Sequence, residues 1–190
     1  MISRIDHVAI AVRDYPKALD FFTKLMDPAT GAADTEGELG FFWQVLTVGD
    51  LSRLELLAPS AEKSFLDSFL AEKQGGVHHI TLQTADIEAC RRRLDDLGIG
   101  YFGYNAEKQD WKELFIHPRE AFGVLLQIAE FPAEKYLPKE KRLAGHRRWR
   151  IESTEKGGRL TLAHPGGGLV EVDLDRQEIE AMSAELRSLL

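Results

Sequence analysis

The sequence predicts an α+β fold that contains two tandem copies of one module and a C-terminal extension. Two apolar, strand-like runs that each contain a histidine, His7 and His79, lie 72 residues apart. Each histidine is followed 48 residues later by a polar residue inside a second apolar run, Glu55 in one copy and Gln127 in the other. Self-similarity at a fixed period indicates repeated structural units. The two copies are therefore expected to contribute one nitrogen and one oxygen ligand each to a shared metal-binding cup.

The first copy begins with a strand over residues 5–12, where apolar and small or polar residues alternate. Asp14 caps the helix that follows, whose apolar positions recur at helical spacing. Residues 28–40 are rich in glycine and aspartate and are expected to form a loop. Two strands over 41–48 and 51–57, joined by a turn, complete the copy.

The second copy follows a linker that is predicted to be helical from Ser60 to Lys73. A strand over 77–84 places His79 on one face, and Asp86 caps the next helix, which ends at Gly98. Three further strands are expected over residues 101–104, 111–117 and 123–129.

The extension repeats neither copy. It is predicted to contain short β-hairpin strands over 148–153, 159–164 and 169–174 and a helix over 176–190. The predicted domains are residues 1–131, made of modules 1–59 and 75–131 with the helical linker 60–74, and the extension 132–190.

Composition excludes several classes of protein. The net charge of −7 argues against binding to nucleic acid, which requires a basic face. Cys90 is the only cysteine, so neither a disulfide framework nor a cysteine-based zinc site is expected. No apolar run is long enough for a membrane span, and the first strand leaves no room for a signal peptide. We therefore expect a cytoplasmic protein without membrane partners.

The four polar residues of the repeat have the chemistry of metal ligands. Imidazole nitrogens such as those of His7 and His79 bind many divalent metals. Glu55 lies between leucines in a strand, where an unpaired carboxylate would cost several kcal/mol, and a metal partner would explain its presence. Gln127 offers an amide oxygen as a ligand, but an amide cannot act as a general base.

Four segments of the chain carry a resemblance to a known family: IDHVAIAV (5–12), LELLAP (54–59), GGVHHI (75–80) and IHPREAFGVLLQI (116–128). Together they resemble the vicinal oxygen chelate superfamily and, within it, the methylmalonyl-CoA epimerases. The resemblance covers residues 1–131, about two thirds of the chain.

The resemblance implies paired βαβββ modules that form a cup around one divalent metal ion (Co, Ni, Zn, Mn or Fe), with His7, Glu55, His79 and Gln127 as its ligands. The chain departs from the family at Gln127, where family members usually have glutamate. A small-molecule substrate, such as a CoA thioester, and a homodimer are also implied.

The resemblance further implies proton abstraction next to a metal-chelated carbonyl, with stabilisation of the enolate. Glu55 is the first candidate base, and Glu38 is the second because family bases come from this region. Gln83, Thr81 and Trp43 are candidate contacts to the substrate. The alternatives are a glyoxalase I-type lactoylglutathione lyase, an Fe(II) dioxygenase and a non-enzymatic ligand-binding or resistance protein of the same fold.

Overall fold

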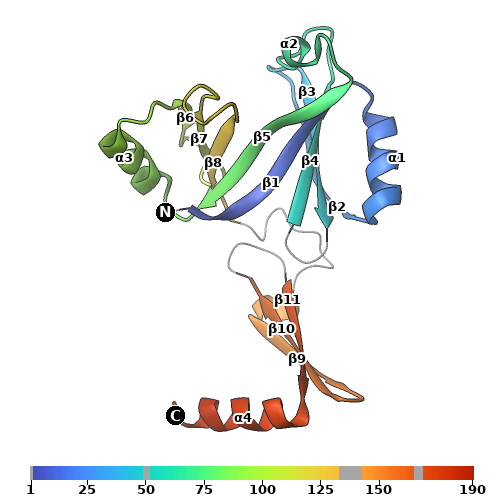
Figure 1. Cartoon of the computed structure of the whole chain (residues 1–190), viewed down its shortest axis with the longest axis vertical. Coiled ribbons are helices and arrows are strands. Elements are labelled where there is room, and N and C mark those ends of the chain that lie inside the picture. The colour runs from blue at the N-terminus through green and yellow to red at the C-terminus, as the bar shows by residue number, and fades with distance from the viewer. Residues whose placement is uncertain (1, 49–51, 133–142, 165–168) are drawn as a thin grey trace.

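A computed structural model describes residues 2–48, 52–132, 143–164 and 169–190 of the chain (Figure 1). Residues 1–132 contain both predicted copies, and each copy has the order strand, helix and three strands. The first copy contains β1 (Ile2–Val12), α1 (Tyr15–Met26), β2 (Ala29–Glu36), β3 (Phe41–Val48) and β4 (Ser52–Pro59). The second contains β5 (Gly75–Thr84), α3 (Ile87–Leu97), β6 (Phe102–Asn105), β7 (Lys112–Ile116) and β8 (Leu126–Glu130).

The eight strands form one sheet with the order β2-β3-β4-β1-β5-β8-β7-β6. The copies meet where β1 pairs with β5 in antiparallel orientation, and this pair crosses the centre of the sheet in Figure 1. Within each copy the first strand pairs with the last in parallel, β1 with β4 and β5 with β8. The strand order therefore reads the same outward from the centre in both directions, which confirms the predicted tandem modules.

Strand β2 was not predicted, because residues 28–40 were expected to be a loop. The strand forms the edge of the sheet next to β3, and most of its residues are exposed. An edge strand with little burial needs no apolar alternation, so its sequence lacks the signal of a strand. The predicted turn at Gly49 and Asp50 lies outside the described residues.

Helices α1 and α3 begin as predicted. The carboxylate of Asp14 accepts a hydrogen bond from the Lys17 amide, and that of Asp86 accepts one from the Ala89 amide. Gly98 ends α3 in the left-handed conformation. The apolar side of α3 packs on the second half of the sheet through a buried cluster: Ile87, Cys90, Leu94, Leu114, Ile116 and Ile128.

The predicted linker helix is largely absent. Helix α2 covers only Asp67–Leu70, and the rest of the linker is irregular. Leu66 and Leu70 are nevertheless buried, and they pack with Ala9, Ala11 and Leu57 at one end of the first copy. Burial of these two leucines, not a long helix, holds the linker on the sheet.

The extension forms a second sheet with the order β11-β10-β9. Its elements are β9 (Trp149–Thr154), β10 (Gly157–Ala163), β11 (Leu169–Asp175), the 3-10 turn η3 (Ala144–His146) and α4 (Arg176–Arg187). Asp175 and Glu178 form a capping box at the start of α4. In the described ranges no helix has the length and apolarity that a membrane span requires.

Candidate metal centre

The pairing of the central strands brings the predicted ligands to one place. Ala9 on β1 is paired on one side with Glu55 on β4 and on the other with His79 on β5. Two residues away, and therefore on the same face, His7 is paired with Thr81. His7, Glu55 and His79 therefore lie on the face of the sheet that also carries the small side chain of Ala9.

Three predicted ligands point their donor atoms at one another. His7 Nε2 lies 3.5 Å from Glu55 Oε2, and His79 Nε2 lies 3.7 Å from the same oxygen. One ligand atom from each residue lies within 4.8 Å of the others. This arrangement joins nitrogen donors from both halves to a carboxylate of the first half.

The surroundings of His79 fit a cation in this group. Its Nε2 is buried and has no hydrogen-bond partner among the described residues, although buried polar atoms are normally paired. The side chains of His7, His79 and Glu55 are 5%, 9% and 12% exposed. Two imidazoles and one carboxylate, enclosed in this way, suit a divalent transition metal.

Gln127 extends the same cluster from β8. It is paired with Thr81, whose hydroxyl donates to Gln127 Oε1 over 2.5 Å and lies 2.9 Å from His7 Nε2. The amide nitrogen of Gln127 donates in the opposite direction, to Glu113 Oε2 on β7 at 2.6 Å. The amide oxygen is therefore the end that faces the two histidines and Glu55.

The residue before His7 holds its imidazole ring. Asp6 Oδ2 lies 2.8 Å from His7 Nδ1, and Asp6 Oδ1 accepts hydrogen bonds from Arg4 and Arg53. Asp6 and Arg53 are buried. A carboxylate on the second nitrogen of a metal-binding histidine fixes its tautomer and leaves Nε2 free for the metal. Sequence analysis did not single out Asp6, although its place directly before the repeated histidine was a usable signal.

His78 takes the same place in the second half. Its Nδ1 lies 2.9 Å from His79 Nδ1, and its ring meets Phe65 and Phe69 edge-on at centroid distances of 5.4 and 4.9 Å. His79 is therefore oriented by a neighbouring imidazole that is packed between aromatic rings of the linker.

The two histidines of the cluster, His7 and His79, have opposite electrostatic environments. Burial lowers the pKa of His7, but the hydrogen bonds that its ring donates to Asp6 and Glu55, together with the negative charges of these carboxylates, outweigh burial and raise the pKa to about 9. Burial, together with the positive charges of His7 and His78, lowers the pKa of His79 to about 3. In the metal-free protein, His7 carries a proton at neutral pH and His79 does not.

The predicted bases lie in different places. Glu55 belongs to the cluster, whereas Glu38 is exposed in the turn between β2 and β3 and is not part of the cluster. That turn is fixed to the linker by hydrogen bonds from the Ser60 amide to the Gly40 carbonyl and from the Phe65 amide to the Leu39 carbonyl. Glu38 is therefore presented at the edge of the first half from an anchored turn.

The three predicted substrate contacts also differ in their surroundings. Trp43 is paired with Leu57, two residues along β4 from Glu55, so it lies on the face of the cluster. Thr81 is fully buried and bonds within the cluster. Gln83 is buried, accepts from Arg4 and donates to the Phe131 carbonyl, so its amide is used inside the protein. Of the three residues, Trp43 is the one that is only partly buried.

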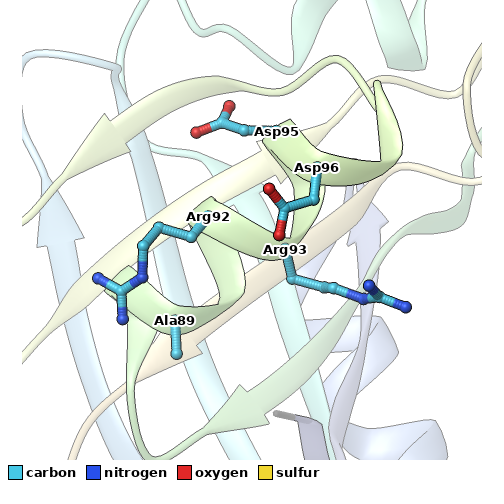
Figure 2. Close-up of a pocket in the computed structure, with 5 residues that line it drawn as sticks. All are labelled: Ala89, Arg92, Arg93, Asp95 and Asp96. Atoms are coloured by element: carbon cyan, nitrogen blue, oxygen red, sulfur yellow. The ribbon is translucent and has the colours of Figure 1, made fainter.

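A surface hollow of about 460 Å³ lies away from these residues, on α3 (Figure 2). It is lined by Ala89, Arg92, Arg93, Asp95 and Asp96. The four charged side chains are on the solvent side of the helix, opposite its buried residues. The hollow contains none of the predicted site residues.

Comparison with known proteins identifies the family. The sequence profile of the glyoxalase/bleomycin resistance protein/dioxygenase superfamily matches residues 6–115. The chain belongs to this superfamily. The ethylmalonyl-CoA/methylmalonyl-CoA epimerase of Cereibacter sphaeroides is 33% identical over 134 residues, which are 68% of this chain and 99% of that protein. The mitochondrial methylmalonyl-CoA epimerase of Homo sapiens is 29% identical over 139 residues, and the match covers 68% of this chain and 74% of the human protein.

Solved structures agree with these relatives. A Streptomyces coelicolor methylmalonyl-CoA epimerase variant in complex with 2-nitronate-propionyl-CoA has a TM-score of 0.62 and 28% identity, over 70% of this chain and 100% of that one. The Mycobacterium tuberculosis methylmalonyl-CoA epimerase has the same TM-score at 26% identity, over 73% and 91%. The predicted superfamily, fold class and likeness to the epimerases are confirmed, and the relatives indicate an epimerase enzyme. The lyase, dioxygenase and resistance-protein alternatives are not favoured, and the homodimer stays a prediction.

Proposed function

We propose that the protein is a metal-dependent epimerase that inverts the α-carbon of a malonyl-type CoA thioester, such as methylmalonyl-CoA or ethylmalonyl-CoA. The observation that carries the proposal is the cluster of His7, Glu55 and His79, with ligand atoms within 4.8 Å, in a chain whose relatives are epimerases of these thioesters. Gln127 Oε1 is proposed as the fourth ligand because it faces the same space.

The metal would supply Lewis-acid polarisation of the thioester carbonyl, which makes the adjacent C–H bond more acidic. Two neutral imidazoles, one carboxylate and one amide leave a divalent ion with a net charge of +1. If Gln127 were a carboxylate, the net charge would be zero. The glutamine therefore keeps the site more electrophilic, and it removes one group able to accept a proton.

Epimerisation transfers the α-proton to a base on one face of the carbon and returns a proton on the other face, without net gain or loss. Since Gln127 cannot carry that proton, we assign the role to carboxylates of the first half. Glu55 is within the cluster, and Glu38 is on the anchored turn at the edge of the same half.

The separation of Glu38 and Glu55 along the chain supports Glu38 as a base. Two Streptomyces coelicolor epimerase variants crystallised with 2-nitronate-propionyl-CoA replace a glutamate and a glutamine that are seventeen positions apart. Glu38 and Glu55 are separated by the same number of positions. Gly40 preserves this turn, because its φ is +65° and a Cβ there would come within 2.2 Å of the Lys63 carbonyl oxygen.

Deuterium incorporation tests the proposal. The purified protein is stripped with a chelator, reloaded with Co²⁺, Ni²⁺, Zn²⁺ or Mn²⁺, and incubated with methylmalonyl-CoA in D₂O, and incorporation at the α-carbon is followed by mass spectrometry. Exchange is expected with the loaded protein and not with the stripped protein. Absence of exchange with every metal, or exchange that is equal with and without metal, would contradict the proposal. The hemithioacetal of methylglyoxal and glutathione serves as the comparison substrate and is expected to be unreactive.

A further inference from the structure

The carboxylate of Glu113 is in contact with Gln127, the residue at which the two copies differ. Glu113 lies on β7, paired with Ala129, and its Oε2 accepts from Gln127 Nε2 at 2.6 Å. The same oxygen accepts from Trp111 Nε1 at 2.8 Å. The Trp111 indole therefore fixes the position of the Glu113 carboxylate, and this carboxylate in turn fixes the Gln127 amide.

This contact determines which end of the Gln127 amide faces the cluster of His7, Glu55 and His79. A carboxylate has no proton to donate, so it can pair only with the NH₂ end of Gln127. The carbonyl end then points to Thr81 and the histidines. If the amide were reversed, Oε1 would face a carboxylate oxygen at hydrogen-bond distance, and the NH₂ group would face the cation. Both contacts are repulsive.

Among its described residues, the first half contains no equivalent of this arrangement. Glu55 is paired with Val45 on β3, and two residues further along the strands Leu57 is paired with Trp43. In the second half Gln127 is paired with Phe115, and Ala129 with Glu113. Glu113 thus occupies the position that Trp43 has in the first half. Glu55 offers an oxygen in either orientation and needs no such partner, whereas Gln127 does.

We propose that Glu113 is a positioning residue that fixes the Gln127 amide with its oxygen toward the metal. In this chain the second half has an amide at position 127 and a carboxylate at position 113, and the orientation of the amide depends on that carboxylate. The inference rests on the proposed metal site. A glutamate introduced at 127 would therefore face the Glu113 carboxylate at a separation of about 2.6 Å.

Co²⁺ binding measured by titration calorimetry, with the visible spectrum of bound Co²⁺ as a second readout, tests the assignment. Glu113→Ala is expected to weaken Co²⁺ binding about 10- to 100-fold, as for other partners of metal ligands. Glu113→Gln retains an acceptor oxygen and is expected to fall between Glu113→Ala and the wild type. Glu107→Gln makes the same change in the exposed loop before β7 and should bind as the wild type does. Thermal melts of all variants confirm that they are folded.

The decisive comparison is Gln127→Glu made in the presence and in the absence of Glu113. The gain in Co²⁺ affinity from Gln127→Glu should be at least about tenfold greater in the Glu113→Gln background, where repulsion is relieved. Equal effects in the two backgrounds, or a Glu113→Ala variant that binds Co²⁺ as tightly as the wild type, would overturn the inference while the proposed function stands.

If the wild type bound no divalent metal, the proposed function would fail, and only the contact between Glu113 and Gln127 would remain of the inference. The contact is then measured in the metal-free protein by the ¹⁵N-correlated NMR signal of the Gln127 NH₂ group. Its proton shift should change in Glu113→Ala and not in Glu107→Gln. An unchanged signal would remove the contact on which the inference depends.

Discussion

The two halves of the eight-stranded sheet share a geometry and differ in charge. Each half places a histidine on its central strand, a proposed oxygen ligand on the parallel neighbour, and a partner for histidine Nδ1 one residue before the histidine. In the first half the partner is Asp6 and the oxygen ligand is Glu55. In the second half they are His78 and Gln127. The repeat therefore fixes where the donor atoms lie, and the residues that break the repeat set the protonation of each half.

This difference separates two tasks within one site. The first half contains both proposed proton carriers and the histidine whose pKa is raised to about 9. The second half contributes a histidine that is neutral at any pH well above 3 and an amide that is held in one orientation. We infer that the second half completes the coordination of the metal and the first half performs the proton transfer.

The strongest way to break the comparison is to remove one histidine from each half. His7→Ala and His79→Ala are each expected to weaken Co²⁺ binding by about 10³-fold or more, because the ion bridges the halves. The change is measured by calorimetry, and His117→Ala, at an exposed position after β7, is the matched control. If either variant bound Co²⁺ normally, the shared site would be wrong.

Removal of the proposed base should separate binding from chemistry. Glu38→Gln is expected to slow α-proton exchange by about 10²- to 10⁴-fold with unchanged Co²⁺ affinity, since Glu38 lies outside the ligand cluster. Glu36→Gln alters an exposed carboxylate on the same hairpin and should leave exchange intact. Normal exchange in Glu38→Gln would leave Glu55 as the base.

The partners of the two histidines should differ in their effect on stability. Asp6→Asn leaves the buried Arg53 without its counter-charge and is expected to lower the free energy of unfolding by about 3–5 kcal/mol. His78 forms no ion pair within the part of the chain that the structure describes, so His78→Ala should lower the free energy of unfolding by less. Urea denaturation measures both, and Asp20→Asn, in an exposed pair with Lys24, should change stability by less than about 1 kcal/mol. Equal losses in Asp6→Asn and Asp20→Asn would contradict the role assigned to Asp6.

The smallest of the expected effects is in the pH dependence of metal binding, to which His7 and His79 should contribute differently. The metal must displace the proton of His7, so apparent Co²⁺ affinity is expected to rise about tenfold per unit between pH 6 and pH 8. His79, with a pKa of about 3, adds no dependence in this range.

The contribution of His7 to the stability of the metal-free protein should fall as the pH rises, whereas Co²⁺ affinity should increase. Its raised pKa contributes stability that is fully present below pH 6.5 and is lost as the pH rises through 9.

A calorimetric titration in buffers of different ionisation enthalpy counts the proton released on Co²⁺ binding. Release of no proton at pH 7 would contradict the charged state of His7.

The sequence was sufficient for the modules and for the cluster of His7, Glu55 and His79, because both depend on local pattern. Strand β1 alternates, His7 and His79 recur at one offset, and Glu55 interrupts a run of leucines. These signals come from burial on one face of a strand, which a sequence records directly. The strands and the C-terminal helix of the extension were also predictable, because the predicted ranges 148–153, 159–164, 169–174 and 176–190 overlap β9, β10, β11 and α4.

Contacts between strands are not recorded in this way. Glu113 is fourteen residues before Gln127, and only the pairing of β7 with β8 brings the two side chains together. Strand β2 lacks apolar alternation because it is an exposed edge, and the linker was predicted to be a helix although only four of its residues form α2. The predicted boundary between residues 131 and 132 stays a prediction, since residues 133–142 lie outside the described ranges.

Anomalous diffraction from a crystal loaded with Co²⁺ tests the central claim most directly. One peak per chain is expected, at about 2.0–2.2 Å from His7 Nε2, His79 Nε2, a Glu55 oxygen and Gln127 Oε1. A site without a peak, or a peak coordinated by residues of only one half, would contradict the claim that the two halves hold one metal between them.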